Sequence, residues 1–113
     1  MSVDLQPTQV SELADTFGLL SDSTRLSIVL ECIDQERSAG DIAEALGVSP
    51  SLVSHHLRLL RAARMLRPDR RGKQVFYTLD DACVRSVLKI MIDHLFVHDH
   101  TREGATEKGN DQW

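Results

Sequence analysis

Cysteine and long apolar runs are scarce in this chain, and each shortage excludes a class of protein. Two of the 113 residues are cysteine, too few for a disulfide-stapled secreted domain and consistent with free thiols in a reducing compartment. No apolar run approaches the roughly 20 residues that span a bilayer. The opening MSVDLQPTQV lacks a basic segment followed by an apolar one, as a signal peptide would have. We therefore expect a cytoplasmic protein with no membrane partner.

The length and the hydropathy pattern predict one folded domain. A chain of 113 residues is long enough for a single modest core. The final segment TREGATEKGNDQW has no apolar periodicity, which is typical of disorder. We therefore expect a domain over residues 1–100 and a disordered tail over 101–113.

Basic residues are concentrated in one part of an acidic chain. The net charge is −4, yet the segment from Arg58 to Lys73 contains seven basic residues and one acid. The rest of the chain then carries a net charge of −10. An acidic body with one basic strip is typical of a protein that contacts nucleic-acid phosphates; the alternative is a merely solvated face.

Apolar residues at helical spacing predict four helices before residue 65. The first spans about residues 9–19. The third ends at Gly47, a residue suited to a left-handed stop, and the fourth has Pro50 in its first turn, where proline is tolerated. The residues expected to cap the second, third and fourth helices are Ser21, Asp22 or Ser23, then Ser38, then Ser49.

The period changes in MLRPDRRGKQVFYTLD, residues 65–80. Two strand-like runs flank Arg70, Arg71 and Gly72, a pattern that indicates a β-hairpin. After Asp80 the helical period resumes and continues to about His98. The predicted fold class is mainly α with a β-hairpin.

The segment AGDIAEALGVSPSLVSHHLRLL predicts a helix-turn-helix. Ala43 lets two helices cross closely, Gly47 turns the chain, and Val53 packs the second helix onto the first. A basic hairpin directly after this motif makes it a winged helix-turn-helix, the usual partner of which is double-stranded DNA. A winged helix that contacts only protein is the alternative.

Two groups of side chains are candidates for DNA contact. The first group is on the exposed N-terminal side of the second helix of the motif, where it can reach base edges and phosphates; the second group is on the wing and would hold backbone phosphates. For His55 and His56, a packing or capping role is an equal alternative. The DNA-contact candidates are Ser51, Ser54, His55 and Arg58 on the helix, and Arg70, Arg71 and Lys73 on the wing.

The stretches DSTRLSIVL, DIAEALGVSPSLVSHHLRLL and RRGKQVFYTLDD together resemble the ArsR/SmtB family of small winged-helix repressors. The resemblance extends to about His100. It implies a homodimer, formed through the terminal helices, that binds operator DNA and is released by a metal ion or another inducer. It also implies no enzymatic activity and no small-molecule substrate.

The resemblance also implies where metal would bind. Many members carry cysteine ligands in the third helix, but here Ser38 and Gly40 stand at those positions, so that site is missing. Other members bind metal on the last helix through Asp-x-His and, ten residues later, His-x-x-Glu or His-x-x-His. Asp81 and His94 match this pattern, Cys83 replaces the first histidine, and Val97 stands where the last ligand would be.

Spacing adds to this expectation. Cys83 and His94 are eleven positions apart, about 16 Å along a helix axis, so one ion cannot bridge them within one helix. The two side chains share a helical face, and an antiparallel pair of last helices would set Cys83 of one chain level with His94 of the other. His98, or His100, would replace the ligand lost at Val97. A thiolate, two imidazoles and a carboxylate suit Zn(II), with Co(II) or Cd(II) as substitutes and Ni(II) if His100 adds a ligand.

Two further functions are alternatives. A thiol-based redox or persulfide sensor of the same fold would use Cys32 and Cys83, one in the second helix and one in the last. An enzyme is suggested only by His94 and His98, which have the spacing of a metalloprotease motif, but Leu95 stands where the glutamate base is needed. We therefore predict no enzyme.

Overall fold

The structure, a computed structural model, describes residues 3–97. The chain divides into two compact units, residues 1–80 and 81–113, and each is described by itself. The predicted tail, 101–113, lies outside the described residues. The elements are α1 (Pro7–Leu20), α2 (Ser23–Glu31), β1 (Arg37–Ser38), α3 (Ala39–Leu46), α4 (Pro50–Ala62), β2 (Leu66–Arg71), β3 (Gln74–Leu79), α5 (Ala82–Ile92) and the π-helical turn η1 (Asp93–Val97).

The predicted helix caps are confirmed. The Asp22 carboxylate accepts a hydrogen bond from the Arg25 backbone N–H at 2.9 Å and caps α2. Ser38 caps α3 by accepting from the Asp41 N–H at 3.1 Å, and Ser49 caps α4 in the same way. Such caps satisfy backbone donors that the first helical turn leaves unpaired.

The first helix begins earlier than the apolar spacing predicts. It starts at Pro7, not at residue 9. Proline loses nothing at a first helical position because its missing N–H would have no partner there. The Gln6 backbone N–H donates to the Gln9 side chain at 2.9 Å, so polar contacts extend the helix beyond its apolar residues.

α3 and α4 form the predicted helix-turn-helix. Gly47 ends α3 with φ of 67°, in the left-handed region, and the Val48 N–H then donates to the Ala43 carbonyl at 3.2 Å. Ala43 and Val53 are both buried, as the close crossing of two helices requires. The turn therefore places α4 with one face against α3 and the other exposed.

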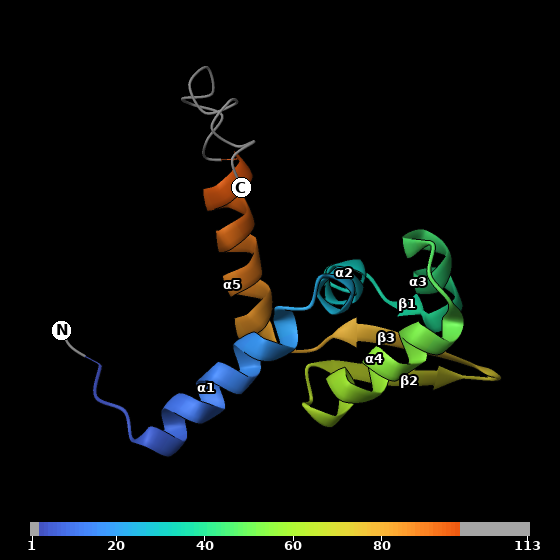
Figure 1. Ribbon diagram of the computed structural model, residues 1–113. Coiled ribbons are helices and arrows are strands. Elements are labelled where there is room, and N and C mark those ends of the chain that lie inside the picture. Colours follow the sequence, from blue (N-terminus) through green and yellow to red (C-terminus); the bar gives the residue numbers. More distant parts are fainter. Residues whose placement is uncertain (1–2, 98–113) are drawn as a thin grey trace. The chain divides into compact units, whose positions relative to one another are not determined.

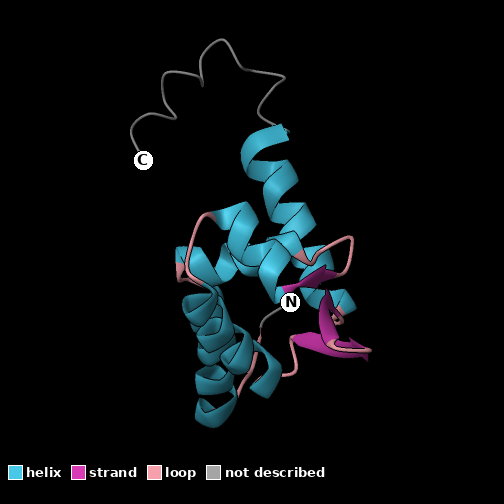
Figure 2. Ribbon diagram, turned by 90° about the vertical axis from the view of Figure 1, so that its right-hand side faces the viewer, coloured by secondary structure: helices cyan, strands magenta, loops and turns pink. Residues whose placement is uncertain are grey.

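The wing is a hairpin of β2 and β3 within a three-stranded antiparallel sheet of order β1-β3-β2. Arg71 pairs with Gln74 across a turn that contains Gly72 with φ of 63°. The third strand, β1, was missed: it is two residues long, and Ser38 serves both as strand and as helix cap. The three strands are seen together in Figure 2, and α4 lies along the hairpin in Figure 1.

The core of the first unit is apolar and is shared by α2, α3, α4 and the sheet. Cys32, at the end of α2, is fully buried, and its carbonyl accepts a hydrogen bond from the Leu79 N–H at 3.1 Å. This bond joins the end of α2 to the last strand. The fully buried side chains are Ile28, Ile42, Leu60, Leu66, Leu79, Val29, Val53 and Cys32.

The described part of the second unit, residues 81–97, is helical. The Asp81 carboxylate accepts hydrogen bonds from the Cys83 and Val84 N–H groups at 3.0 and 3.1 Å and caps α5. The α-helix ends at Ile92 and continues as η1, not as the regular helix that the apolar period predicts. No helix within residues 3–97 is long and apolar enough to cross a membrane.

Candidate nucleic-acid interface and metal ligands

The two faces of α4 have opposite character. Val53, Leu57 and Leu60 are buried against the rest of the unit. The predicted reading side chains are all exposed; they are Ser51, Ser54, His55 and Arg58. α4 thus presents hydroxyl, imidazole and guanidinium groups, which can donate to base edges and phosphates.

The two adjacent histidines on α4 separate into two environments. His55 is exposed, whereas His56 is buried. His56 Nδ1 lies 3.2 Å from a guanidinium nitrogen of Arg25, and its Nε2 lies 3.8 Å from the Asp22 carboxylate. Burial lowers the pKa of His56, against the opposing effect of the Asp22 charge. His56 therefore takes the packing alternative that the sequence analysis left open.

The Arg25 side chain extends this cluster to α1. Its Nε donates to the Leu19 carbonyl at 2.7 Å, so one guanidinium joins the last turn of α1, the start of α2 and the inner face of α4. This cluster was not predicted from the sequence because Asp22 and Arg25, at the start of α2, lie more than 30 residues before their partner His56 on α4. The signal available in the sequence was His56, a polar residue among the apolar residues of the buried face of α4.

On the wing, Arg71 is held by acids of its own unit. Its guanidinium forms ion pairs with Glu36 and, at 3.1 Å, with Asp69, and it lies 4.9 Å from the centre of the Phe76 ring. The hydrogen bond to Glu36, followed by that to Asp69, raises the pKa of Arg71 above its usual value. A DNA phosphate would have to compete with these carboxylates for Arg71.

Four other cations on α4 and the wing have no such partner. Within residues 3–97, no carboxylate forms an ion pair with Arg58, Arg61, Arg70 or Lys73. Unpaired exposed cations on neighbouring elements attract phosphates. Arg61 was counted in the basic strip but not among the predicted DNA contacts.

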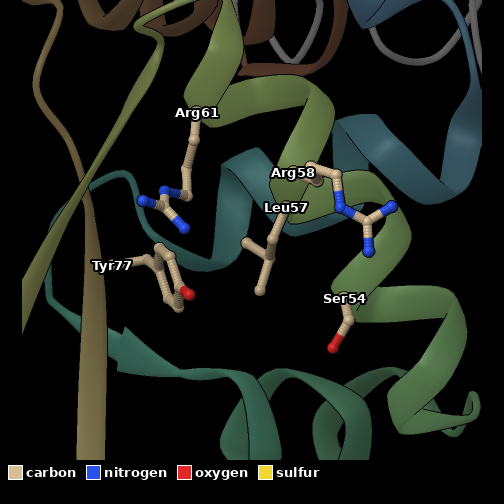
Figure 3. Close-up of a pocket in the computed structure, with 5 residues that line it drawn as sticks. All are labelled: Ser54, Leu57, Arg58, Arg61 and Tyr77. Carbon is tan, nitrogen blue, oxygen red and sulfur yellow. The ribbon is translucent and has the colours of Figure 1, made fainter.

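Two shallow pockets lie between α4 and the hairpin, and they share Arg61 and Tyr77. The first has a volume of about 210 Å³ and the second about 220 Å³. Figure 3 shows the first, with four side chains from α4 and Tyr77 from β3. Its lining residues are Ser54, Leu57, Arg58, Arg61 and Tyr77; those of the second are Arg61, Pro68, Arg70, Val75 and Tyr77.

The predicted metal ligands that fall within the described residues all lie in the second unit. Cys83 is exposed in α5 and His94 is exposed in η1. One oxygen of Asp81 is occupied by the α5 cap, which leaves the other oxygen for a ligand role. His98 and His100 lie outside the described residues. In one chain, over residues 3–97, no three histidine, cysteine or acidic side chains come together as a metal site.

The two thiols differ sharply. Cys83 is exposed, while Cys32 is fully buried. Burial, with a smaller contribution from the charge of Glu31, raises the pKa of the Cys32 thiol to about 12. Because the thiolate is the reactive form of cysteine, burial and the raised pKa both disfavour reaction at Cys32.

Known proteins resemble this chain in both sequence and fold. Residues 22–67 match the bacterial regulatory protein family arsR. A transcriptional repressor SmtB homolog of Synechocystis is 38% identical over 84% of this chain and 69% of its own length. A cadmium resistance transcriptional regulatory protein CadC homolog of Staphylococcus aureus is 32% identical over 84% of this chain and 76% of its own length. The crystal structure of the AntR antimony-specific transcriptional repressor superposes with a TM-score of 0.76 at 26% identity, covering 88% and 92% of the two chains.

The relatives are DNA-binding regulators and not enzymes, as the winged helix-turn-helix and its exposed reading face indicate. The chain belongs to the arsR family of bacterial transcriptional regulators, as a repressor with metal-sensing relatives.

Proposed function

We propose that this chain is a metal-responsive repressor that binds operator DNA as a homodimer and releases it when a divalent ion, Zn(II) above others, binds the last helix. The single observation that carries the DNA-binding part is the exposed face of α4. This face carries hydroxyl, imidazole and guanidinium groups, and Arg70 and Lys73 lie on the wing. Within residues 3–97, no carboxylate forms an ion pair with Arg58, Arg70 or Lys73.

Exposed apolar side chains on the terminal helices support the homodimer. Val10, Leu13 and Phe17 of α1 are each about half exposed. α5 and η1 expose a second set, of which Ile90 and Phe96 are each about two-thirds exposed. Large contiguous apolar patches on soluble proteins mark interaction sites, and a symmetric pair of chains would cover both sets.

The donor set supports a metal site between two protomers. Cys83 and His94 are exposed, and Asp81 keeps one carboxylate oxygen outside the helix cap. Thiolate, imidazole and carboxylate donors suit Zn(II), with Co(II) or Cd(II) as substitutes. His98, or His100, would complete the set, and Ni(II) would suit a site to which His100 adds a further ligand. A bound ion would supply a bridge between the two last helices.

The relatives' names favour a metal inducer, since one is a cadmium resistance regulator and one is antimony-specific. A redox or persulfide sensor that pairs Cys32 with Cys83 receives no support from Cys32, which is buried and has a raised pKa. We therefore keep metal sensing as the proposed function.

The test is a titration of metal-free full-length protein against duplex DNA taken from upstream of its own gene, with a random duplex of equal length as reference. We expect preference for the upstream duplex, and a weakening of at least fivefold when Zn(II) is added, because coupling between sites is typically about 1–3 kcal/mol. Tight operator binding that no metal alters would contradict metal sensing.

Cys83→Ser and His94→Ala test the ligands. Each should keep the DNA affinity of the metal-free protein but lose the response to metal. The Co(II) form should also show a thiolate-to-metal charge-transfer band that Cys83→Ser abolishes and that Cys32→Ser leaves intact. A band lost in Cys32→Ser instead would place the site elsewhere.

A further inference from the structure

The pocket in Figure 3 lies beside the exposed face of α4 and contains two polar side chains outside the predicted DNA contacts. They are Arg61 of α4 and Tyr77 of β3. We propose that this pocket holds a phosphate of the DNA backbone, with Arg61 and the Tyr77 hydroxyl as its donors. The inference rests on the proposed function, since it adds a contact to the same DNA-binding surface.

Tyr77 gives the first reason. Its side chain is buried, with 9% of its surface exposed, and within residues 3–97 its hydroxyl has no hydrogen-bond partner. The hydroxyl oxygen is not among the buried polar atoms without a partner, so the ring is packed while the hydroxyl stays open to the pocket, as is common for tyrosines at binding surfaces. In Figure 3 the Tyr77 hydroxyl points into the space between α4 and β3. The pocket therefore presents a donor with no acceptor of the protein's own.

Charge gives the second reason. Arg58 and Arg61 both line the pocket, and Arg61 extends toward the Tyr77 ring in Figure 3. In the described part of the chain neither guanidinium is paired with a carboxylate, in contrast to Arg71 on the wing. In Figure 3 the Arg61 guanidinium and the Tyr77 hydroxyl lie on the same side of Leu57, while Arg58 points away from them. A guanidinium and a hydroxyl are both donors, and together they suit an acceptor-only anion such as a phosphodiester.

The positions of the two pockets indicate that the phosphate belongs to a DNA strand. The second pocket shares Arg61 and Tyr77 and continues to Arg70 on the wing. The two pockets thus adjoin at Arg61 and Tyr77, and their linings together extend from Ser54 on α4 to Arg70 on the hairpin. A DNA strand that passes from α4 to the wing would cross Arg61 and Tyr77 on the way. The phosphates of its backbone are the charged acceptors that such a strand presents to the protein.

Three single variants test the pocket. Tyr77→Phe removes only the hydroxyl oxygen, and Arg61→Gln removes one pocket cation from an exposed side chain. Arg64→Gln is the matched control, because Arg64 is an exposed cation of the same basic strip that lines neither pocket. Each variant is titrated by fluorescence anisotropy, over a range of salt concentrations, against the upstream duplex and a random duplex of equal length.

Tyr77→Phe should weaken binding to both duplexes by about tenfold or more, the loss of one hydrogen bond to a charged group, with no change in salt dependence. The two duplexes should be affected alike because phosphate contacts carry no sequence information. Arg61→Gln should weaken binding and also lower the slope of log affinity against log salt by about 0.9, one phosphate contact. Arg64→Gln should change the slope less.

The inference would be overturned if Tyr77→Phe bound DNA with native affinity. It would also be overturned if Arg61→Gln and Arg64→Gln had the same DNA affinity and the same salt slope. If the native protein prefers its upstream DNA while both pocket variants bind like the native protein, only this inference fails. A native protein that binds neither duplex overturns the proposed function as well. If Tyr77→Phe lowers the stability of the fold, Arg61→Gln still tests the pocket, because Arg61 is exposed.

Inorganic phosphate distinguishes a free anion from the DNA backbone. Tyr77 is the only tyrosine in the chain, so its ring NMR signals report on the pocket without ambiguity. In the native protein we expect these signals to shift both with millimolar phosphate and with DNA. In Arg61→Gln we expect no shift with DNA, and this pair of results would support the assignment to the DNA backbone. Signals that shift with phosphate but not with DNA would assign the pocket to a soluble anion and would overturn the inference.

Discussion

His56 is a buried titratable group at the centre of a polar cluster on the inner side of α4. The charged and titratable groups facing it are Asp22, Arg25 and the neighbouring His55. Burial lowers its pKa below the ordinary value of 6.5, so the folded chain holds the neutral form, which accepts a hydrogen bond from Arg25. The same cluster joins the start of α2 to the reading helix.

The pKa of His56 predicts how stability depends on pH. Since the folded-state pKa is below 6.5, the unfolded chain binds the proton more readily, and the free energy of unfolding should fall as the pH drops from about 7 to 5. The capping carboxylates Asp22 and Asp41, whose pKa values are lowered from 3.8, lose their contribution only below about pH 4. Urea unfolding should show a smaller loss between pH 7.5 and 5.5 in His56→Gln, whereas His55→Gln should keep the native loss.

Arg71 and Lys73 are close in sequence but differ in their partners. Lys73→Ala should lower the salt slope of DNA binding by about 0.9, one phosphate contact. Arg71→Ala should lower it less, because Glu36 and Asp69 already neutralise the guanidinium. Glu36→Gln should steepen the slope by freeing Arg71. Equal slopes for the two alanine variants would show that Arg71 leaves its acids when DNA binds.

Two glycines, one in the first turn of α3 and one directly after its last residue, have opposite requirements. Gly47 has φ of 67°, and a Cβ added there meets nothing within 4 Å, so only backbone conformation is at issue. Gly40 lies in the first turn of the same helix, where an added Cβ would meet the Ser38 hydroxyl at 3.9 Å, an ordinary contact.

Gly47→Ala should therefore destabilise the fold by about 1 kcal/mol, the cost of a left-handed conformation for a residue with a side chain. Gly40→Ala should stabilise it by about 0.5 kcal/mol, because alanine restricts the unfolded chain more than glycine does. Chemical unfolding of the two variants measures both signs. A stabilising Gly47→Ala would mean that the turn between α3 and α4 adopts another conformation in solution.

The whole molecule, in our proposal, is a pair of chains joined through exposed apolar residues of the terminal helices. Ile90→Glu puts a charge on a side chain that is 66% exposed in the single chain. We expect this variant to sediment as a monomer and to bind the upstream duplex at least tenfold more weakly, since one chain can occupy only one half-site. Val3→Glu, at a side chain that is 80% exposed and outside the helices, should remain dimeric. A dimeric Ile90→Glu would move the interface elsewhere.

The elements that the sequence predicted are those that depend on neighbours along the chain. The caps at Asp22, Ser38 and Ser49, the left-handed Gly47 and the hairpin around Gly72 are confirmed. Caps, turns and apolar periods act over a few residues, so their physical causes can be read from a short stretch of sequence.

The contacts decided only by the tertiary structure join residues far apart in the chain. Ser38 pairs with Phe76 in the sheet, Arg25 contacts His56, and Glu36 forms an ion pair with Arg71, one of the predicted DNA contacts. The sequence does show that these side chains carry charge or hydrogen-bonding groups. Which of them meet depends on how α2, α4 and the hairpin pack around the apolar core, because long-range partners are selected by packing and not by spacing.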